Sequence, residues 1–128
     1  MEFTLTTLLN ASPKEIYNAW LQSDAHTNMT GGPATASNNV GGKFTAWDGY
    51  IWGENLALVP NTKIVQSWRT HEFSETDGDS LISITFEEQN QSTLLTLVHS
   101  NVPTDGDKYK KGWVDHYFEP MASYFSNK

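Results

Sequence analysis

The sequence contains no cysteine, and this absence excludes several kinds of site. Without thiols the chain has no disulfide framework, no thiolate ligand for a metal ion and no cysteine nucleophile. Long apolar runs are missing as well, and no window approaches the roughly 18 consecutive apolar residues that mark a membrane-spanning helix. The first residues, Met1 to Thr4, lack the basic start and the apolar stretch of a signal peptide. We therefore expect a cytoplasmic protein.

Basic residues are also scarce. The chain has 8 Lys and Arg against 15 Asp and Glu, which gives a formal net charge of −7. Nucleic-acid binding requires a basic face, and anionic membrane surfaces attract basic segments, so we expect neither as a partner. An acidic surface most often only keeps a protein soluble, although it also suits a basic protein partner.

Aromatic residues, in contrast, are abundant for a chain of 128 residues, with five Trp, five Tyr and six Phe. Each of these side chains buries a large area, so even a small domain can fill a core with them. The length suits one domain, and we expect residues 1–128 to form it.

The N-terminal part of the sequence predicts a strand followed by one or two short helices. Apolar and polar residues alternate over residues 3–10, as in a strand with one buried face. Ser12 is then a suitable helix N-cap, Pro13 suits the first helical position, and Glu15 completes a capping box. A second short helix is expected near residues 24–29.

The middle of the sequence predicts a series of strands joined by short turns, which is typical of an antiparallel meander. Asp48-Gly49 is a two-residue hairpin signal, because both positions of such a turn need positive φ. Gly, Asn, Asp and Pro punctuate the remaining boundaries. The expected strands cover residues 43–47, 50–59, 63–73, 82–87 and 93–99.

The C-terminal segment changes to a helical period. From residue 107 to 126, apolar residues recur every three to four positions, namely Tyr109, Trp113, Tyr117, Met121 and Tyr124 or Phe125. Pro120 should remove one backbone hydrogen bond and bend this helix. Gly112, beside Trp113, should allow a close approach to the sheet. We predict an α+β fold in which a curved antiparallel sheet of about six to seven strands wraps on this long helix.

Several segments together resemble a known family. They are Gly41-Gly42-Lys43-Phe44, Asp48-Gly49, Leu58-Val59-Pro60, the run Lys63 to Arg69, Val102-Pro103, Gly112-Trp113 and Tyr117-Phe118-Glu119. In this order and spacing they resemble the C-terminal-type domain of the activator of heat-shock-protein-90 ATPase, within the helix-grip or START-like superfamily. The resemblance covers nearly the whole chain.

The resemblance implies a sheet wrapped on a long helix, often around an interior cavity. In the eukaryotic co-chaperone such a domain is the second of two and helps to bring the chaperone's N-terminal domains together, while the first domain binds the chaperone's middle segment. This chain begins at the family's first strand and carries no such first domain, a departure that counts against ATPase stimulation.

Four histidines are present, and none has metal-ligand spacing with another. His99 shares strand parity with Leu95 and Leu97, so it is expected to point inward, as a general base, a ligand donor or a hydrogen-bonded core residue. His116 should lie at the helix edge or toward solvent. His26 and His71 are expected to be exposed. We expect no metal and no cofactor.

Glu54 has the strand parity of Trp52 and Leu56. If that face is interior, Glu54 is a partly buried carboxylate with a raised pKa and a candidate acid or base. Otherwise it pairs with a cation on the outer face, and a bulge at Gly53 could reset the parity. Arg69 either pairs with such a carboxylate or lies on the surface.

The aromatic set suggests a cavity between sheet and helix, unless these rings fill that space as core. Its members are Trp47, Tyr50, Trp52, Trp68, Phe86, Trp113 and Tyr117. The candidate ligand-binding residues are Trp52, Glu54, Trp68, Phe86, Leu97, His99, Trp113, Tyr117 and Met121.

Three functions follow from these observations. The first is a non-enzymatic domain that binds a hydrophobic small molecule between sheet and helix. The second, which the resemblance implies, is a co-chaperone-type interaction module with heat-shock protein 90 as partner. The third is a cyclase-like or hydrolase-like enzyme that uses Glu54 or His99.

Overall fold

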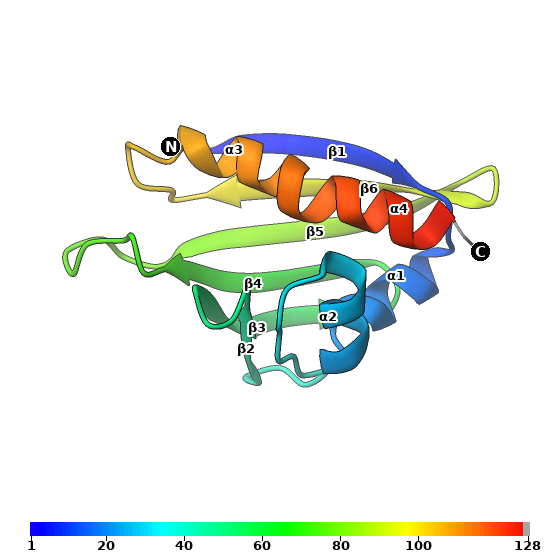
Figure 1. Ribbon diagram of the computed structural model, residues 1–128, viewed down its shortest axis with the longest axis horizontal. Coiled ribbons are helices and arrows are strands. Elements are labelled where there is room, and N and C mark those ends of the chain that lie inside the picture. Colours follow the sequence, from blue (N-terminus) through cyan, green and yellow to red (C-terminus); the bar gives the residue numbers. More distant parts are fainter. Residues whose placement is uncertain (127–128) are drawn as a thin grey trace.

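The computed structural model describes residues 1–126 and has the predicted α+β architecture (Figure 1). A six-stranded antiparallel sheet carries a long C-terminal helix, and two short helices follow the first strand. The elements are β1 (Phe3–Leu9), α1 (Pro13–Trp20), α2 (Ser23–Thr30), β2 (Lys43–Ala46), β3 (Ile51–Val59), β4 (Lys63–Thr70), β5 (Ser80–Gln89), β6 (Ser92–Ser100), α3 (Asp107–Trp113), the π-helical η1 (Val114–Phe118) and α4 (Glu119–Ser126).

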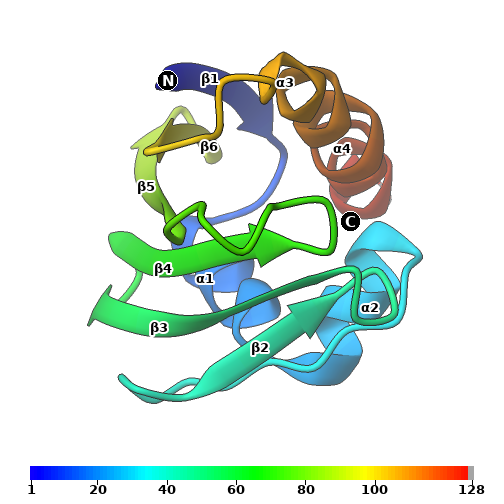
Figure 2. The ribbon, with the colours of Figure 1, turned by 90° about the vertical axis from the view of Figure 1, so that its left-hand side faces the viewer.

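The sheet is a meander to which the first strand is added at the far side, in the order β1-β6-β5-β4-β3-β2. Its register places apolar side chains in rows across the strands. Ile64 lies opposite Ile84, Ile84 opposite Leu97, and Leu97 opposite Leu5. Because alternate residues of a strand point to opposite faces, these rows form one apolar face. The sheet curves with this face inward, and the long helix lies along its open side (Figure 2).

Helix α1 begins as the sequence predicts. The backbone N–H of Glu15 donates to Oγ of Ser12 at 3.2 Å, and the backbone N–H of Ser12 donates to Oε1 of Glu15 at 3.3 Å. Pro13 occupies the first helical position. The cap therefore satisfies N–H groups that the first helical turn would otherwise leave unpaired.

The C-terminal helix runs continuously through α3, η1 and α4. The predicted disruption at Pro120 takes the form of the π-helical turn Val114–Phe118, which lies just before it. Proline has no N–H to donate, and its ring crowds the carbonyl one turn earlier, at His116. A wider turn at this place accommodates the ring without ending the helix. None of the helices described within residues 1–126 is both long and apolar enough to cross a bilayer.

The β2–β3 hairpin exists, but its turn is longer than the two residues predicted. The strands end at Ala46 and resume at Ile51, and φ is positive at Trp47, Asp48 and Gly49, at 52°, 58° and 86°. Residues 47–50 form the turn, so Trp47 leaves the ladder. The backbone N–H of Asp48 donates instead to the carbonyl of Pro33 at 2.8 Å.

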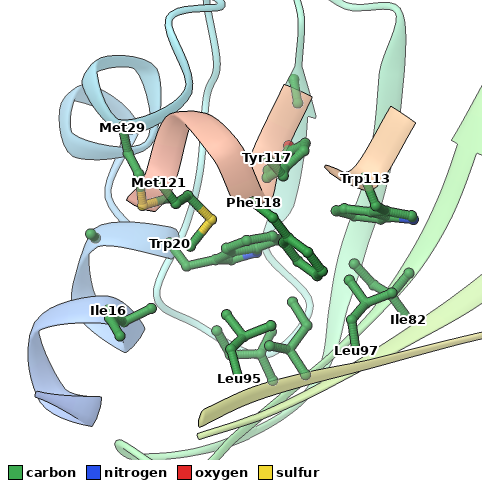
Figure 3. Close-up of a cluster of buried hydrophobic side chains, with 14 of the residues drawn as sticks. Ile16, Trp20, Met29, Ile82, Leu95, Leu97, Trp113, Tyr117, Phe118 and Met121 are labelled. Atoms are coloured by element: carbon green, nitrogen blue, oxygen red, sulfur yellow. The ribbon is translucent and has the colours of Figure 1, made fainter. Parts of the chain in front are cut away.

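The core fills the space between the sheet, the long helix and the two short helices (Figure 3). Trp113 is 3% exposed, which confirms that the long helix buries its aromatic face. Trp20 of α1 stacks on Trp113, with ring centroids 6.3 Å apart. Met29 of α2 and Met121 of α4 close the far end of this cluster. Residues far apart in the sequence therefore share one core.

Candidate functional site

A pocket of about 420 Å³ lies between the first half of the long helix and one end of the sheet. This volume falls within the range of small-molecule sites. The helix contributes one wall, and β3, β4 and the turns beside them contribute the other. The lining residues are Trp47, Tyr50, Ile51, Trp68, Glu72, Lys108, Tyr109, Gly112, Trp113, His116 and Tyr117.

Aromatic rings form most of the pocket wall. Tyr109, Trp113 and Tyr117 recur every four residues and therefore lie on one face of the helix. Trp68 of β4 faces them, with its ring centroid 5.1 Å from that of Tyr109 and 5.6 Å from that of Trp113. The central rings thus contact one another and hold the wall in place.

Gly112 opens the pocket on the helix side. A Cβ atom added there would meet no atom within 4 Å. The prediction that this glycine allows a close approach to the sheet is therefore wrong, because the space beside it belongs to the pocket.

Polar side chains gather at the pocket mouth around Glu72. Nζ of Lys108 donates to Oε1 of Glu72 at 2.6 Å, and the hydroxyl of Tyr50 donates to the other carboxylate oxygen. These donors, Lys108 first, lower the pKa of Glu72. Burial, followed by the bond to the Glu72 carboxylate, raises the pKa of Tyr50. Glu72 is therefore charged and Tyr50 is neutral at physiological pH.

Arg69 organises the loop of residues 71–79, which carries Glu72. Its guanidinium donates to the backbone carbonyls of Ser74 and Asp77, each at 2.7 Å, and to the carboxylate of Asp79 at 3.3 Å. Neither alternative predicted for Arg69 is found, because its guanidinium is not paired with Glu54 and is not a free cation on the surface. Arg69 instead determines the shape of the loop.

Trp47 lies at the opposite side of the mouth in a constrained position. Its φ of 52° is unusual for a bulky residue, and its buried Nε1 has no hydrogen-bond partner among residues 1–126. The ring packs against His116, with centroids 5.3 Å apart. It also covers Gly32, where an added Cβ would lie 2.3 Å from Cε3 of Trp47. The hairpin turn is thus held by a tryptophan that fits against a glycine.

His99 lies behind the pocket and is completely buried. Nε1 of Trp113 donates to Nδ1 of His99 at 3.1 Å, so Nε2 carries the ring proton and donates to Oγ of Ser80 at 2.9 Å. Ser80 in turn donates to the carbonyl of Trp68 at 2.6 Å. Burial lowers the pKa of His99 to about 3. The inward orientation is confirmed, and the ring is a neutral link between helix and sheet.

His26 corrects a prediction, because it is buried rather than exposed, with 3% of its surface accessible. Its Nδ1 lies 2.8 Å from the carbonyl of Trp20, and its Nε2 lies 3.0 Å from the hydroxyl of Tyr117. A carbonyl only accepts, so Nδ1 carries the proton and Nε2 accepts from Tyr117. Burial lowers the pKa of His26 and raises that of Tyr117. Helix α2 packs against the long helix, which the local sequence does not reveal.

Trp52 and Glu54 do not belong to the pocket, so their assignment as ligand-binding residues is wrong. Trp52 is 37% exposed and pairs across the sheet with Arg69, whose side chain points outward. The inward residues of this strand are Ile51 and Asn55. No bulge occurs at Gly53, and the register shift follows Asn55, so Glu54 keeps the outward parity of Trp52.

The other predicted site residues divide between the pocket and the core. Trp68, Trp113 and Tyr117 line the pocket. His99 does not line the pocket, but its ring packs against three residues that do, Trp68, Tyr109 and Trp113. Phe86, Leu97 and Met121 are buried but are not part of the lining, because they lie deeper between helix and sheet.

Sequence reasoning missed Ile51, Glu72, Lys108, Tyr109, Gly112 and His116 as site residues. Tyr109 and Gly112 carried a signal, since they share the helical segment with Trp113. Glu72 and Lys108 carried none, because they are 36 residues apart and meet only when the helix crosses the end of the sheet. Within residues 1–126, no group of three or more His, Asp or Glu is placed to hold a metal ion.

The fold and this pocket between helix and sheet define a START-like, helix-grip protein. A family model described as "Activator of Hsp90 ATPase homolog 1-like protein" matches residues 10–126. The chain therefore belongs to the activator of Hsp90 ATPase homolog 1-like family.

Two similar curated proteins are larger than this chain. The activator of 90 kDa heat shock protein ATPase homolog 1 from Homo sapiens is 31% identical over 125 residues, which is 97% of this chain and 37% of that protein. The homologue from Dictyostelium discoideum is 31% identical over 117 residues, which is 90% of this chain and 30% of that protein. The chain thus spans about a third of the length of these relatives.

A solved structure agrees closely in both fold and length. The crystal structure of an HSP90 activator from Plasmodium falciparum superposes with a TM-score of 0.89 at 26% identity, covering 98% of this chain and 96% of that one. A protein from Mesorhizobium loti gives a TM-score of 0.83 at 20% identity, covering 100% and 98%, and supports the fold alone.

Proposed function

We propose that this chain is a non-enzymatic binding domain that acts on heat-shock protein 90 as a co-chaperone-type module. The observation that carries the proposal is its match, over almost the full length of both chains, to a solved protein described as an HSP90 activator. The family assignment and the curated relatives support it. The net charge of −7 further favours a partner with a basic surface.

Binding to the purified chaperone tests this proposal directly. Isothermal titration calorimetry should give a complex with heat-shock protein 90, and the complex should tighten when a non-hydrolysable ATP analogue is bound. A parallel assay measures whether the domain changes the chaperone's ATPase rate. An unrelated acidic protein of similar charge serves as the control. No complex at several hundred micromolar, with and without nucleotide, would remove the proposal.

The pocket supports a second candidate function, the binding of a hydrophobic small molecule. Its volume and aromatic walls suit such a ligand. Gly112→Leu should fill the space beside the helix, whereas Val114→Leu adds bulk on the exposed side and serves as the matched control. In a titration with lipids and aromatic compounds, amide shifts should cluster at Trp68, Tyr109 and Trp113. These shifts should be present in the natural chain and in Val114→Leu, and absent in Gly112→Leu. If the natural chain shows no such shifts, this candidate function is ruled out.

The geometry lends no support to the cyclase or hydrolase alternative. Glu54 lies on the outer face, away from the pocket. Both ring nitrogens of His99 are engaged in hydrogen bonds, and a neutral ring with its proton on Nε2 has no free lone pair for a substrate. A cytoplasmic location and a single-domain organisation remain predictions.

A further inference from the structure

The pocket opens at an acidic end of the molecule. The loop 71–79 carries Glu72, Glu75, Asp77 and Asp79, and Asp105 and Asp107 lie around the start of α3. The two segments are neighbours, because the side chain of Asn101 donates to the carbonyl of Asp79 at 2.9 Å. Figure 1 shows both loops at the same end of the fold. Arg69, Lys108 and Lys110 pair with Asp79, Glu72 and Asp107 and offset part of this charge, and the other three carboxylates leave this end of the molecule net negative.

Among residues 1–126, two charged side chains line the pocket, Glu72 and Lys108, and they are paired with each other. The rest of the lining is dominated by indole and phenol rings, whose faces attract cations. Lys108 already shows this chemistry. Its ammonium contacts the carboxylate of Glu72 and lies 5.4 Å from the ring centroid of Tyr109. The mouth of the pocket is thus built to hold a positive group between a carboxylate and an aromatic face.

Lys108 has a second carboxylate within reach when it leaves Glu72. Its Nζ lies 3.7 Å from a carboxylate oxygen of Asp105. The side chains of Lys108 and Glu72 are 42% and 48% exposed, and exposed ion pairs are weak. An incoming cation can therefore replace Lys108 on Glu72 while Lys108 turns toward Asp105.

We infer that the pocket binds an organic cation, an alkylammonium or guanidinium group, between its aromatic walls and Glu72, in competition with the resident Lys108. This inference deepens the proposed interaction with a chaperone. It rests on that proposed function in one respect, namely that the cationic group is a basic side chain of the partner protein. The pocket volume of about 420 Å³ leaves room for such a side chain.

Two probes of equal shape separate charge from size. Choline and its neutral isostere 3,3-dimethyl-1-butanol are titrated into the full chain while tryptophan fluorescence and indole N–H shifts are followed. Choline should bind about tenfold more tightly, as expected for a cation among aromatic rings. Equal binding of both probes would show a neutral apolar site, and binding of neither would also overturn the inference.

Two variants test the competition between the cations. Lys108→Met should strengthen choline binding, because it frees Glu72, whereas Glu72→Gln should weaken it about tenfold. Lys111→Met is the matched control, since Lys111 pairs with Asp115 and does not line the pocket. Weaker binding in Lys108→Met would mean that Lys108 supports the binding of the probe instead of competing with it for Glu72, and the inference would be wrong. Near-ultraviolet circular dichroism confirms that each variant is folded.

A comparison of two peptides distinguishes a small organic cation from a cationic side chain of a protein as the ligand of the pocket. A short peptide with one arginine is compared with the same peptide carrying citrulline, which has similar shape but no charge. Arginine-dependent shifts at Trp68 and Trp113 support a protein source, whereas shifts with choline alone point to a small molecule and refute the protein source. The affinity of Glu72→Gln for the chaperone is measured in a separate titration. Unchanged chaperone affinity with lost choline binding leaves the docking function intact and removes its link to the pocket.

Discussion

The indole N–H of Trp113 donates to Nδ1 of His99 at 3.1 Å, and this bond joins the long helix to β6 inside the core. His99 passes the connection to Ser80 of β5, and Ser80 donates to the backbone of β4. One chain of hydrogen bonds therefore holds the helix against three adjacent strands. Since Trp113 also lines the pocket, the position of the aromatic wall depends on this buried network.

Replacing Trp113 by alanine should lower the free energy of unfolding by about 3–5 kcal/mol, because a large cavity opens in the core. Trp113→Phe removes the N–H donor but keeps an aromatic ring in this place, so it should cost less free energy of unfolding than Trp113→Ala. Urea denaturation followed by far-ultraviolet circular dichroism measures both. A cost below 1 kcal/mol for Trp113→Ala would contradict the buried position of this residue.

The low pKa of His99 predicts that stability decreases in acid. The unfolded chain protonates this ring below about pH 6.5, whereas the folded chain keeps it neutral down to about pH 3. The unfolded state therefore binds more protons in this interval, and the free energy of unfolding falls as pH falls, by at most about 1.4 kcal/mol per pH unit. His26, whose pKa is also lowered, acts in the same direction.

His99→Gln tests that assignment, because the amide can accept from Trp113 and donate to Ser80 but does not titrate. Its urea midpoint should vary less between pH 6.5 and pH 4 than that of the natural chain. His71→Gln is the control, since that ring is exposed. If the urea midpoint of His99→Gln varies with pH as much as that of the natural chain, His99 is not the source of the acid sensitivity.

Tyr117→Phe should destabilise the protein by about 1–3 kcal/mol, because it leaves Nε2 of His26 buried without a donor. Tyr124→Phe removes a hydroxyl from the same helix at a residue that is 39% exposed, and it should have almost no effect. Thermal unfolding of the pair measures the difference. Equal melting temperatures would show that the His26–Tyr117 bond contributes nothing to stability.

Gly112→Ala should stabilise the protein by about 0.5–1 kcal/mol, since the position is helical and an added Cβ meets open space. Gly53→Ala should have the opposite effect. A Cβ there would lie 1.9 Å from the backbone carbonyl oxygen of Ser67, so strands β3 and β4 would have to separate. Denaturant titration compares the two variants, and a destabilised Gly112→Ala would mean that the space beside the helix is filled.

Local patterns were sufficient for most of the fold. The capping residues Ser12 and Glu15 begin α1 where predicted, and the aromatic period from Tyr109 places the long helix over residues 107–126. Such signals act between residues close in the sequence, so they can be read without knowing the partner. A hairpin around Asp48-Gly49 was also predicted, but its turn is longer than two residues, because the ring of Trp47 leaves the strand and packs against Gly32 and His116.

The candidate site was predicted only in part, because it depends on contacts between distant segments. Trp68, Trp113 and Tyr117 were found from their aromatic character and their period. Glu72 and Lys108 were not, since neither has a local partner that distinguishes it from other surface charges. The face of Trp52 and Glu54 could not be predicted, because alternation along a strand defines two faces but does not say which one is covered.

The order and type of the elements, the absence of cysteine chemistry and the negative charge all follow directly from the amino-acid sequence. Backbone preferences, capping and apolar periodicity are local properties, and they agree with one another along this chain. Three further features depend on the packing of distant segments, namely the inward face of β3, the burial of His26 and the assembly of the pocket mouth. These features follow from the crossing of the long helix over the end of the sheet, which brings together side chains that no local rule connects.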